Sequence, residues 1–330
     1  MISATENFRQ PQKCQSPEKR TVIDRVIVTE EELKNYLDNL RKKQIKKIAL
    51  DMEGDQGSFR YRYSISIFQC FDGEESVIID VLRMGNNPVL KEFLTCQDIT
   101  KVMFSFNNDV FMAQNVLGCT IAPVNDIAIA QKLLGLPINI ANYLNIDKDK
   151  KDSFQRANWL IRPIKPALME YAINDVLKLL EIEQKFADEL TEKDLYITYI
   201  NSTIGISERD FVVNQHCQYQ AKYPGYMRMS YEKRLKAATV WIFRELLGEK
   251  LNCPVGYILS KSALKNIINN DKDLVFAIER EINRGRNPHK RISRQAIQTL
   301  CDQAMQSPHL PSPPPKRKKR KHSPALQTIT

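Results

Sequence analysis

The sequence predicts an α/β domain over about residues 25–190, followed by a smaller all-helical region. Strand patterns come first and helical patterns later, and the two alternate in the middle of the domain, as they do in α/β proteins. From Ser230 to about Gln306 the apolar residues recur at helical spacing. No apolar run approaches the ~20 residues that a membrane span needs, so we expect no membrane partner.

The composition allows two domains and favours a polyanionic partner. The chain has 330 residues, of which 42% are apolar and 27% charged, and its net charge is +10. Six positive charges lie in one run, Lys316–Lys321, so the rest of the chain is only mildly basic. The seven cysteines include no CxxC pair, which argues against a disulfide framework or a structural zinc site and predicts a reducing, intracellular location.

The N-terminal part begins with a polar segment and continues with strands and one helix. Residues 1–24 carry no signal peptide and are predicted to be disordered. A strand over 26–28 leads into a helix that is capped by Thr29, with Glu32 completing a capping box, and that ends near Lys43. Three strand patterns then follow in a row and predict an antiparallel meander: 48–52, 63–68 and 77–81.

Helices dominate the rest of the chain. A further strand is expected over 101–106, and four helical patterns follow it: 109–117, 126–135, 138–144 and 166–188. We therefore place the first domain at 25–195. Three further parts are predicted, namely a linker, a helical domain and a disordered Pro-rich basic tail: 196–229, 230–306 and 307–330.

Two carboxylates stand at the end of the second predicted strand. Asp51 and Glu53 are two residues apart and therefore point to the same face of a strand. Like charges this close repel each other unless water reaches them or a divalent cation neutralises them. The pair is either a Mg²⁺ or Mn²⁺ site or two solvated acids, and further carboxylates are needed to choose between these readings.

Further acids occur in two other segments. The dipeptide Asn108-Asp109 follows a predicted strand, where Asp109 either caps the next helix or supplies a third metal ligand. Tyr171 and Asp175 are four residues apart in a helical pattern and share one face. Their side chains either form a surface hydrogen bond or combine a metal ligand with a group that positions water.

The segment between these acids, Gln155 to Pro163, also has two interpretations. Trp159 is one of only two tryptophans in the chain, and we expect it to pack between helices. Gln155 and Arg162 either contact phosphate or hold the segment in place by hydrogen bonds.

Taken in order, these motifs resemble the ribonuclease D branch of the 3′–5′ exonucleases, whose sites combine four acids with a tyrosine. The resemblance covers about residues 25–190. It depends on the order and spacing of four motifs: Asp51-x-Glu53, Asn108-Asp109, Gln155-(x)₃-Trp159-(x)₂-Arg162-Pro163 and Tyr171-(x)₃-Asp175.

This resemblance implies a ribonuclease H-like fold, with a mixed sheet flanked by helices, and a two-metal hydrolysis. The implied ligands of two Mg²⁺ or Mn²⁺ ions are Asp51, Glu53, Asp109 and Asp175. Tyr171 and Glu53 are the implied catalytic residues: one metal and Tyr171 would orient the attacking water, and the second metal would stabilise the leaving 3′ oxygen. Nucleoside 5′-monophosphates would then leave from the 3′ end of the substrate.

The implied substrate is RNA with a single-stranded 3′ end, such as a tRNA or rRNA precursor, and a larger RNA-processing complex is a further candidate partner. Four residues are candidate nucleic-acid contacts: Phe104, Asn108, Gln155 and Arg162. Phe104 and Phe106 either stack on terminal bases or belong to the core. The chain departs from the family pattern at four positions, none of them a metal ligand: Met52, Gly54, Phe104 and Asp152.

The helical region resembles a second module, the helicase-and-RNase-D C-terminal (HRDC) domain, although a purely structural bundle is the alternative. The matching segments are Trp241-Ile242-Phe243-Arg244-Glu245, Asn252-Cys253-Pro254, Ile258-Leu259 and Ala263-Leu264. The Lys316–Lys321 run is either a nuclear-localisation signal or an RNA tether, so we expect a nuclear protein in a eukaryote and a cytoplasmic one otherwise.

Two other functions remain open, an exodeoxyribonuclease of the same fold and a nucleic-acid-binding adaptor without catalysis.

Overall fold

A computed structural model describes residues 23–144, 153–223, 225–269, 273–284 and 292–312. The predicted disordered ends fall almost wholly outside these residues, as do Asp152 and the Lys316–Lys321 run. The chain divides into two compact units. The first holds a sheet and comprises Met1–Glu53, Ile65–Ala113 and Cys119–Arg209, whereas the second comprises Gly54–Ser64, Gln114–Gly118 and Asp210–Thr330.

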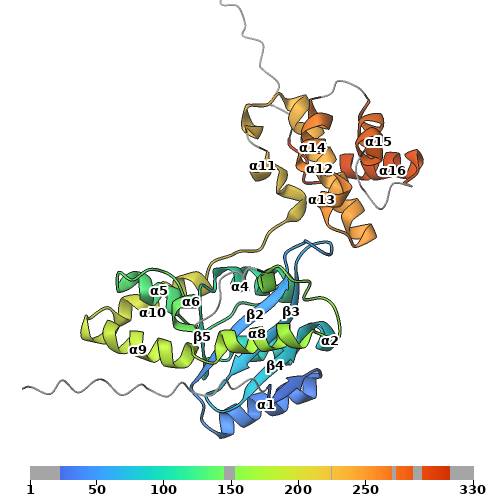
Figure 1. Ribbon diagram of the computed structural model, residues 1–330. Helices are drawn as coiled ribbons and strands as arrows, with labels where there is room; N and C mark the ends of the chain where they lie inside the picture. Colours follow the sequence, from blue (N-terminus) through green and yellow to red (C-terminus); the bar gives the residue numbers. More distant parts are fainter. Residues whose placement is uncertain (1–22, 145–152, 224, 270–272, 285–291, 313–330) are drawn as a thin grey trace, which may run out of the picture. The chain divides into compact units, whose positions relative to one another are not determined.

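A six-stranded mixed sheet forms the centre of the first unit, in the order β1-β4-β3-β2-β5-β6 (Figure 1). Its strands are β1 (Arg25–Ile27), β2 (Lys47–Asp55), β3 (Ser64–Phe71), β4 (Ser76–Asp80), β5 (Thr100–Met103) and β6 (Val124–Asp126). Strands β3 and β4 are antiparallel, as the meander predicts. The pairs β1–β4, β2–β5 and β5–β6 are parallel, so their connections cross over the sheet.

Helices cover both faces of this sheet. On one face α1 (Glu30–Lys42) and α3 (Pro88–Thr95) pack together, and the Tyr36 hydroxyl of α1 lies 3.3 Å from the Cys70 sulfur of β3. On the other face Ala172 of α8 (Pro166–Val176) joins Ile67 and Ile78 in one buried cluster. Ala49 of β2 packs with α9 (Leu179–Glu192) on this second face. Because side chains alternate along a strand, Asp51 and Glu53 point to the same side as Ala49.

The remaining helices of the first unit connect the strands or follow them. They are α2 (Val81–Met84), α4 (Asn107–Met112), α5 (Ile127–Leu133), α6 (Ala141–Leu144) and α10 (Tyr196–Ser207). Helix α4 continues into a π-helical turn (Ala113–Leu117), whose residues from Gln114 onward belong to the second unit. The predicted capping box at the start of α1 is confirmed: the Glu32 N–H donates to the Thr29 hydroxyl at 3.2 Å, and the Thr29 N–H donates to the Glu32 carboxylate at 3.0 Å.

The structure differs from the expected elements at several places. Strand β5 ends at Met103, although a strand is expected over 101–106, and Ser105 beyond it has a left-handed φ of 62°. Helix α6 begins at Ala141, although a helix is expected from residue 138. Residues 166–188 belong to two helices, α8 and α9, which are separated at Leu177–Lys178 without a proline or glycine to mark the break. Strand β6 has only three residues, too few to show an alternating pattern. Helix α10 occupies the start of 196–229, and its exposed Ile197 and Ile204 hide the amphipathic period by which a helix is recognised.

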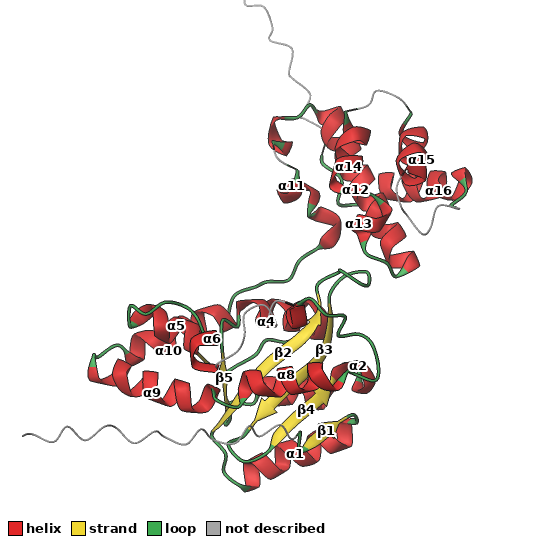
Figure 2. Ribbon diagram, in the orientation of Figure 1, coloured by secondary structure: helices red, strands yellow, loops and turns green. Residues whose placement is uncertain are grey.

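From residue 210 onward, the described part of the chain is helical, without a strand (Figure 2). Its helices are α11 (Tyr219–Lys222), α12 (Tyr231–Leu251), α13 (Val255–Ile258), α14 (Lys261–Ile268), α15 (Leu274–Arg284) and α16 (Arg294–Met305), with short 3₁₀ turns at Gln215–Cys217 and Tyr226–Arg228. The core of this unit gathers around Trp241 and Phe243 of α12. Among the helices described, none is long and apolar enough to cross a membrane.

Candidate metal centre

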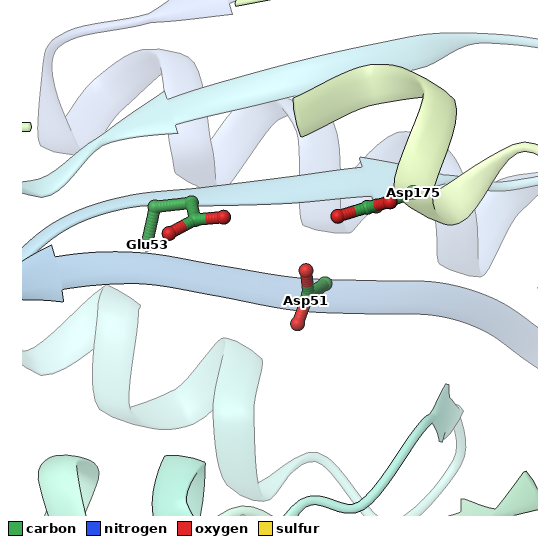
Figure 3. Close-up of side chains that lie close together, drawn as sticks. All are labelled: Asp51, Glu53 and Asp175. Atoms are coloured by element: carbon green, nitrogen blue, oxygen red, sulfur yellow. The ribbon is translucent and has the colours of Figure 1, made fainter. Parts of the chain in front are cut away.

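Three carboxylates converge on the face of the sheet that α8 covers. Asp51 and Glu53 extend from β2, and Asp175 points toward them from α8 (Figure 3). Each supplies a carboxylate oxygen, and these three oxygens all lie within 4.8 Å of one another. Glu53 and Asp175 are each only 8% exposed. Like charges held this close and this far from water are unfavourable unless a cation neutralises them.

The fourth predicted acid, Asp109, lies on the first turn of α4, outside this group of three. Burial raises the pKa of the Asp109 carboxyl well above its usual range, and the nearby charges of Asp51 and Asp126 raise it further. A helix N-terminus favours negative charge, which opposes that effect. The four acids supply carboxylate oxygens only, which is the donor set that Mg²⁺ and Mn²⁺ prefer.

Tyr171 lies beside these acids, one helical turn before Asp175. Burial raises the pKa of its phenol strongly, and the negative charges of Asp175, Glu53 and Asp51 raise it further. The hydroxyl therefore stays protonated at neutral pH and can donate a hydrogen bond within the site. The Tyr171 ring packs against Phe154 and Trp159, with ring centroids 5.2 Å and 6.3 Å away.

Gln69 is a hydrogen-bond partner of Asp51 that the sequence patterns do not predict. This residue is fully buried on β3, and its Nε2 donates to Oδ2 of Asp51 at 2.8 Å. The bond occupies one lone pair of Asp51 and fixes the orientation of its carboxylate. A glutamine within the otherwise apolar end of the Ser64–Phe71 strand is the signal by which it could have been found.

Arg162 lies in a bidentate ion pair with Asp80, at the end of β4. Its Nε and Nη2 donate to the two carboxylate oxygens of Asp80, each at 2.7 Å. Its Nη1 donates to the carbonyl oxygen of Trp159 at 2.8 Å. Of the two interpretations that the sequence allows for Arg162, the structure therefore shows the hydrogen bonds that hold its segment in place. Asp80 is a further residue that the sequence analysis misses.

The other residues predicted to contact the substrate differ in their exposure to solvent. Asn108 and Gln155 are exposed. Phe104 is half-buried and packs at the edge of the cluster that contains Ile127. Phe106 is fully buried, so its ring belongs to the core and the alternative, stacking on a base, is wrong for this residue.

Asp126 shapes the turn that leads to Asn108 and Asp109. One of its oxygens, Oδ1, accepts hydrogen bonds from the backbone N–H groups of Ser105 at 2.7 Å and Ala128 at 2.9 Å. Ser105 has a φ of 62°, a conformation that a serine adopts only when its surroundings impose it. Burial raises the pKa of the Asp126 carboxyl to about 6, although these backbone hydrogen bonds oppose the increase.

Comparison with known proteins identifies the family to which the first unit is similar. Residues 25–191 match a family model described as "3'-5' exonuclease". The chain is 32% identical to ribonuclease D of Xanthomonas oryzae over 162 residues, which are 48% of this chain and 44% of that protein. It is 28% identical to the exosome complex exonuclease RRP6 of Saccharomyces cerevisiae over 197 residues, which are 58% of this chain and 26% of that protein. The chain thus spans less than half the length of these curated relatives.

Two solved structures resemble this one in fold. The crystal structure of Escherichia coli RNase D has a TM-score of 0.69 at 22% identity, over 87% of this chain and 77% of that one. The catalytic core of RRP6 from Trypanosoma brucei has a TM-score of 0.68 at 19% identity, over 85% and 78%. The predicted mixed sheet flanked by helices and the helical second region are thereby confirmed. The family model ends at residue 191, so an HRDC domain over 230–306 stays a prediction.

Proposed function

This chain belongs to the 3′-5′ exonuclease family, and we propose that it is a metal-dependent exoribonuclease that releases nucleoside 5′-monophosphates from the 3′ end of RNA. The observation that carries this proposal is the convergence of Asp51, Glu53 and Asp175 within 4.8 Å. The choice of RNA is supported by the relatives named ribonuclease D and exosome complex exonuclease RRP6.

The acids of the site fit divalent cations. We propose that two Mg²⁺ or Mn²⁺ ions bind there, with four carboxylates as ligands: Asp51, Glu53, Asp109 and Asp175. When bound, such ions neutralise the carboxylates and polarise the scissile phosphate. Burial lowers the effective dielectric constant around these acids. It therefore strengthens their mutual repulsion in the protein without metal, and it would equally strengthen their attraction to a cation.

The protein side chains orient the reactants. Because the pKa of Tyr171 is strongly raised, its hydroxyl serves as a fixed hydrogen-bond donor and acceptor for the attacking water, and not as a base. An oxygen of Glu53 accepts a hydrogen bond from the same water, which keeps a lone pair of that water directed at phosphorus. Gln69 holds one oxygen of Asp51 and so prevents this carboxylate from rotating.

The substrate is proposed to enter as a single strand, because a paired 3′ end would keep its terminal phosphodiester away from buried acids. The exposed Asn108 and Gln155 are the proposed polar contacts, and Phe104 the proposed stacking surface. Trimming of structured RNA, such as tRNA or rRNA precursors, is the proposed role, within the cell and in the nucleus if the source is a eukaryote. A larger RNA-processing complex is the proposed partner.

Cleavage of a 5′-labelled RNA with an unpaired 3′ tail tests this function. The wild type should produce a ladder that shortens from the 3′ end with Mg²⁺ but not with EDTA, and Asp51→Asn should produce none. Asp98→Asn is the matched control, since Asp98 is an exposed acid outside the group. A matched DNA that is cleaved in preference would favour an exodeoxyribonuclease. Binding without cleavage by folded wild type would favour the adaptor.

A further inference from the structure

We propose that Arg162 is a positioning residue, which acts through Asp80 to hold the segment 154–162 against Tyr171, and that it does not contact RNA phosphate. The inference rests on the proposed function, because it concerns the residue that orients the water. An arginine close to a nuclease site is usually expected to bind phosphate, since its planar guanidinium matches that group.

Every N–H of this guanidinium already has an acceptor within the protein. Arginine has five N–H donors and no acceptor. Nε and one N–H of Nη2 bind Asp80, and the other N–H of Nη2 faces the Ser66 hydroxyl at 3.0 Å. Nη1 donates to the carbonyl oxygens of Trp159 at 2.8 Å and Ile161 at 3.0 Å. A phosphate would therefore have to displace bonds that the fold already makes.

The ion pair is also largely withdrawn from solvent. The side chain of Asp80 is 5% exposed and that of Arg162 is 22% exposed. Asp80 lies at the end of β4, where it also accepts a hydrogen bond from the Arg83 N–H at the start of α2. Through Asp80, Arg162 thus connects its segment to the junction of β4 and α2, whose position is fixed by the backbone hydrogen bonds of these two elements.

From Arg162 the contacts lead directly to Tyr171. The Trp159 carbonyl, which Arg162 binds, also accepts a hydrogen bond from the Ser66 hydroxyl at 2.6 Å. The indole N–H of Trp159 donates to the Phe154 carbonyl at 3.1 Å, which closes the segment on itself. Both rings, Trp159 and Phe154, then pack against Tyr171. Loss of the ion pair should therefore free the aromatic groups that keep the phenol in place.

The test compares Arg162→Gln, Asp80→Asn and the double variant in the full chain. Lys165→Gln is the matched control, because it removes an exposed positive charge from the same region. Three quantities are measured: kcat, the dependence of RNA affinity on KCl concentration in EDTA, and the emission of Trp159. The last is read in a Trp241→Phe background, which leaves Trp159 as the sole tryptophan.

If Arg162 is a positioning residue, both single variants shift the Trp159 emission equally and lower kcat by a similar factor, about 100-fold for a misplacement of ~1 Å. The double variant then loses no more than either single one, because both break the same pair. The salt dependence of RNA affinity stays that of the wild type, and Lys165→Gln leaves the Trp159 emission and kcat unchanged.

The opposite pattern would overturn the inference. A phosphate contact predicts that Arg162→Gln alone reduces the slope of log affinity against log salt by ~0.7, with unchanged Trp159 emission and no effect of Asp80→Asn. If Arg162→Gln does not fold, Arg162→Lys replaces it: this variant keeps the charge but not the bidentate pair, and a wild-type kcat would contradict the proposal. Should the wild type cleave no RNA, the emission and salt measurements still decide the role of Arg162.

Discussion

The carboxylate of Asp80 and the three carboxylates of Asp51, Glu53 and Asp175 all belong to the first unit, but they have different surroundings. At Asp80 both oxygens accept hydrogen bonds from Arg162 at 2.7 Å, so the negative charge is balanced within the fold. At Asp51, Glu53 and Asp175, three carboxylate oxygens lie within 4.8 Å of one another. The first arrangement holds a segment in place. The second places like charges close together, which costs stability and fits the divalent-cation site proposed above.

Tyr171→Phe should have the largest effect, which is on the rate of RNA cleavage. This change removes the hydroxyl and keeps the ring, so kcat should fall about 100-fold or more, as when one positioned hydrogen-bond donor is lost. RNA affinity should change little, and single-turnover cleavage and fluorescence anisotropy measure the two quantities. Weakened affinity with an unchanged kcat would show that Tyr171 binds substrate and does not orient water.

The next effect concerns stability and involves Asp80→Asn. Breaking one partner of a buried ion pair leaves the other without a counter-charge, which costs about 3 kcal/mol, at the low end of the usual range because Arg162 is partly exposed. Urea unfolding measures this loss, with Asp98→Asn as the control at an exposed acid. An unchanged free energy of unfolding would mean that the Asp80–Arg162 pair is not an anchor and that the contrast with the acidic group fails.

The carboxylate of Asp126 is an intermediate case, because it accepts hydrogen bonds from backbone N–H groups and not from a charged side chain. Asp126→Asn should therefore have the smallest effect. Burial raises the pKa of its carboxyl to about 6, above the value of about 3.9 for an unfolded chain. The folded state therefore keeps this proton longer, and the wild type should lose roughly 2 kcal/mol relative to Asp126→Asn as the pH rises from about 4 to 6. Parallel denaturation curves at several pH values measure the difference, and identical pH profiles would refute it.

Local sequence patterns predict the acids but not the residues that bind and orient them. Strand alternation places Asp51 and Glu53 on one face, and helical spacing does the same for Tyr171 and Asp175, so each pair follows from a local period. Only the resemblance to a known family brought the pairs together before the structure did. The ion-pair and hydrogen-bond partners were missed for one shared reason.

Those partners are far from each other in the sequence. Gln69 binds Asp51 eighteen residues away, and Arg162 binds Asp80 across eighty-two residues. No local period encodes a contact between two strands or between a strand end and a distant segment. Phe104 and Phe106 show a related limit. Both belong to the strand expected over 101–106, yet Phe104 is half-buried and Phe106 fully buried, because their exposure depends on the elements that pack against them.

Thermal unfolding of the wild type and Asp175→Asn, each in EDTA and in Mg²⁺, tests most directly whether the acidic group is a metal site. Without metal the variant should have the higher melting temperature, because one of three repelling charges is gone. With Mg²⁺ the wild type should gain more and the order should reverse, since only a cation that binds the folded state raises its stability. A wild type that melts above the variant in EDTA and does not respond to Mg²⁺ would contradict the account.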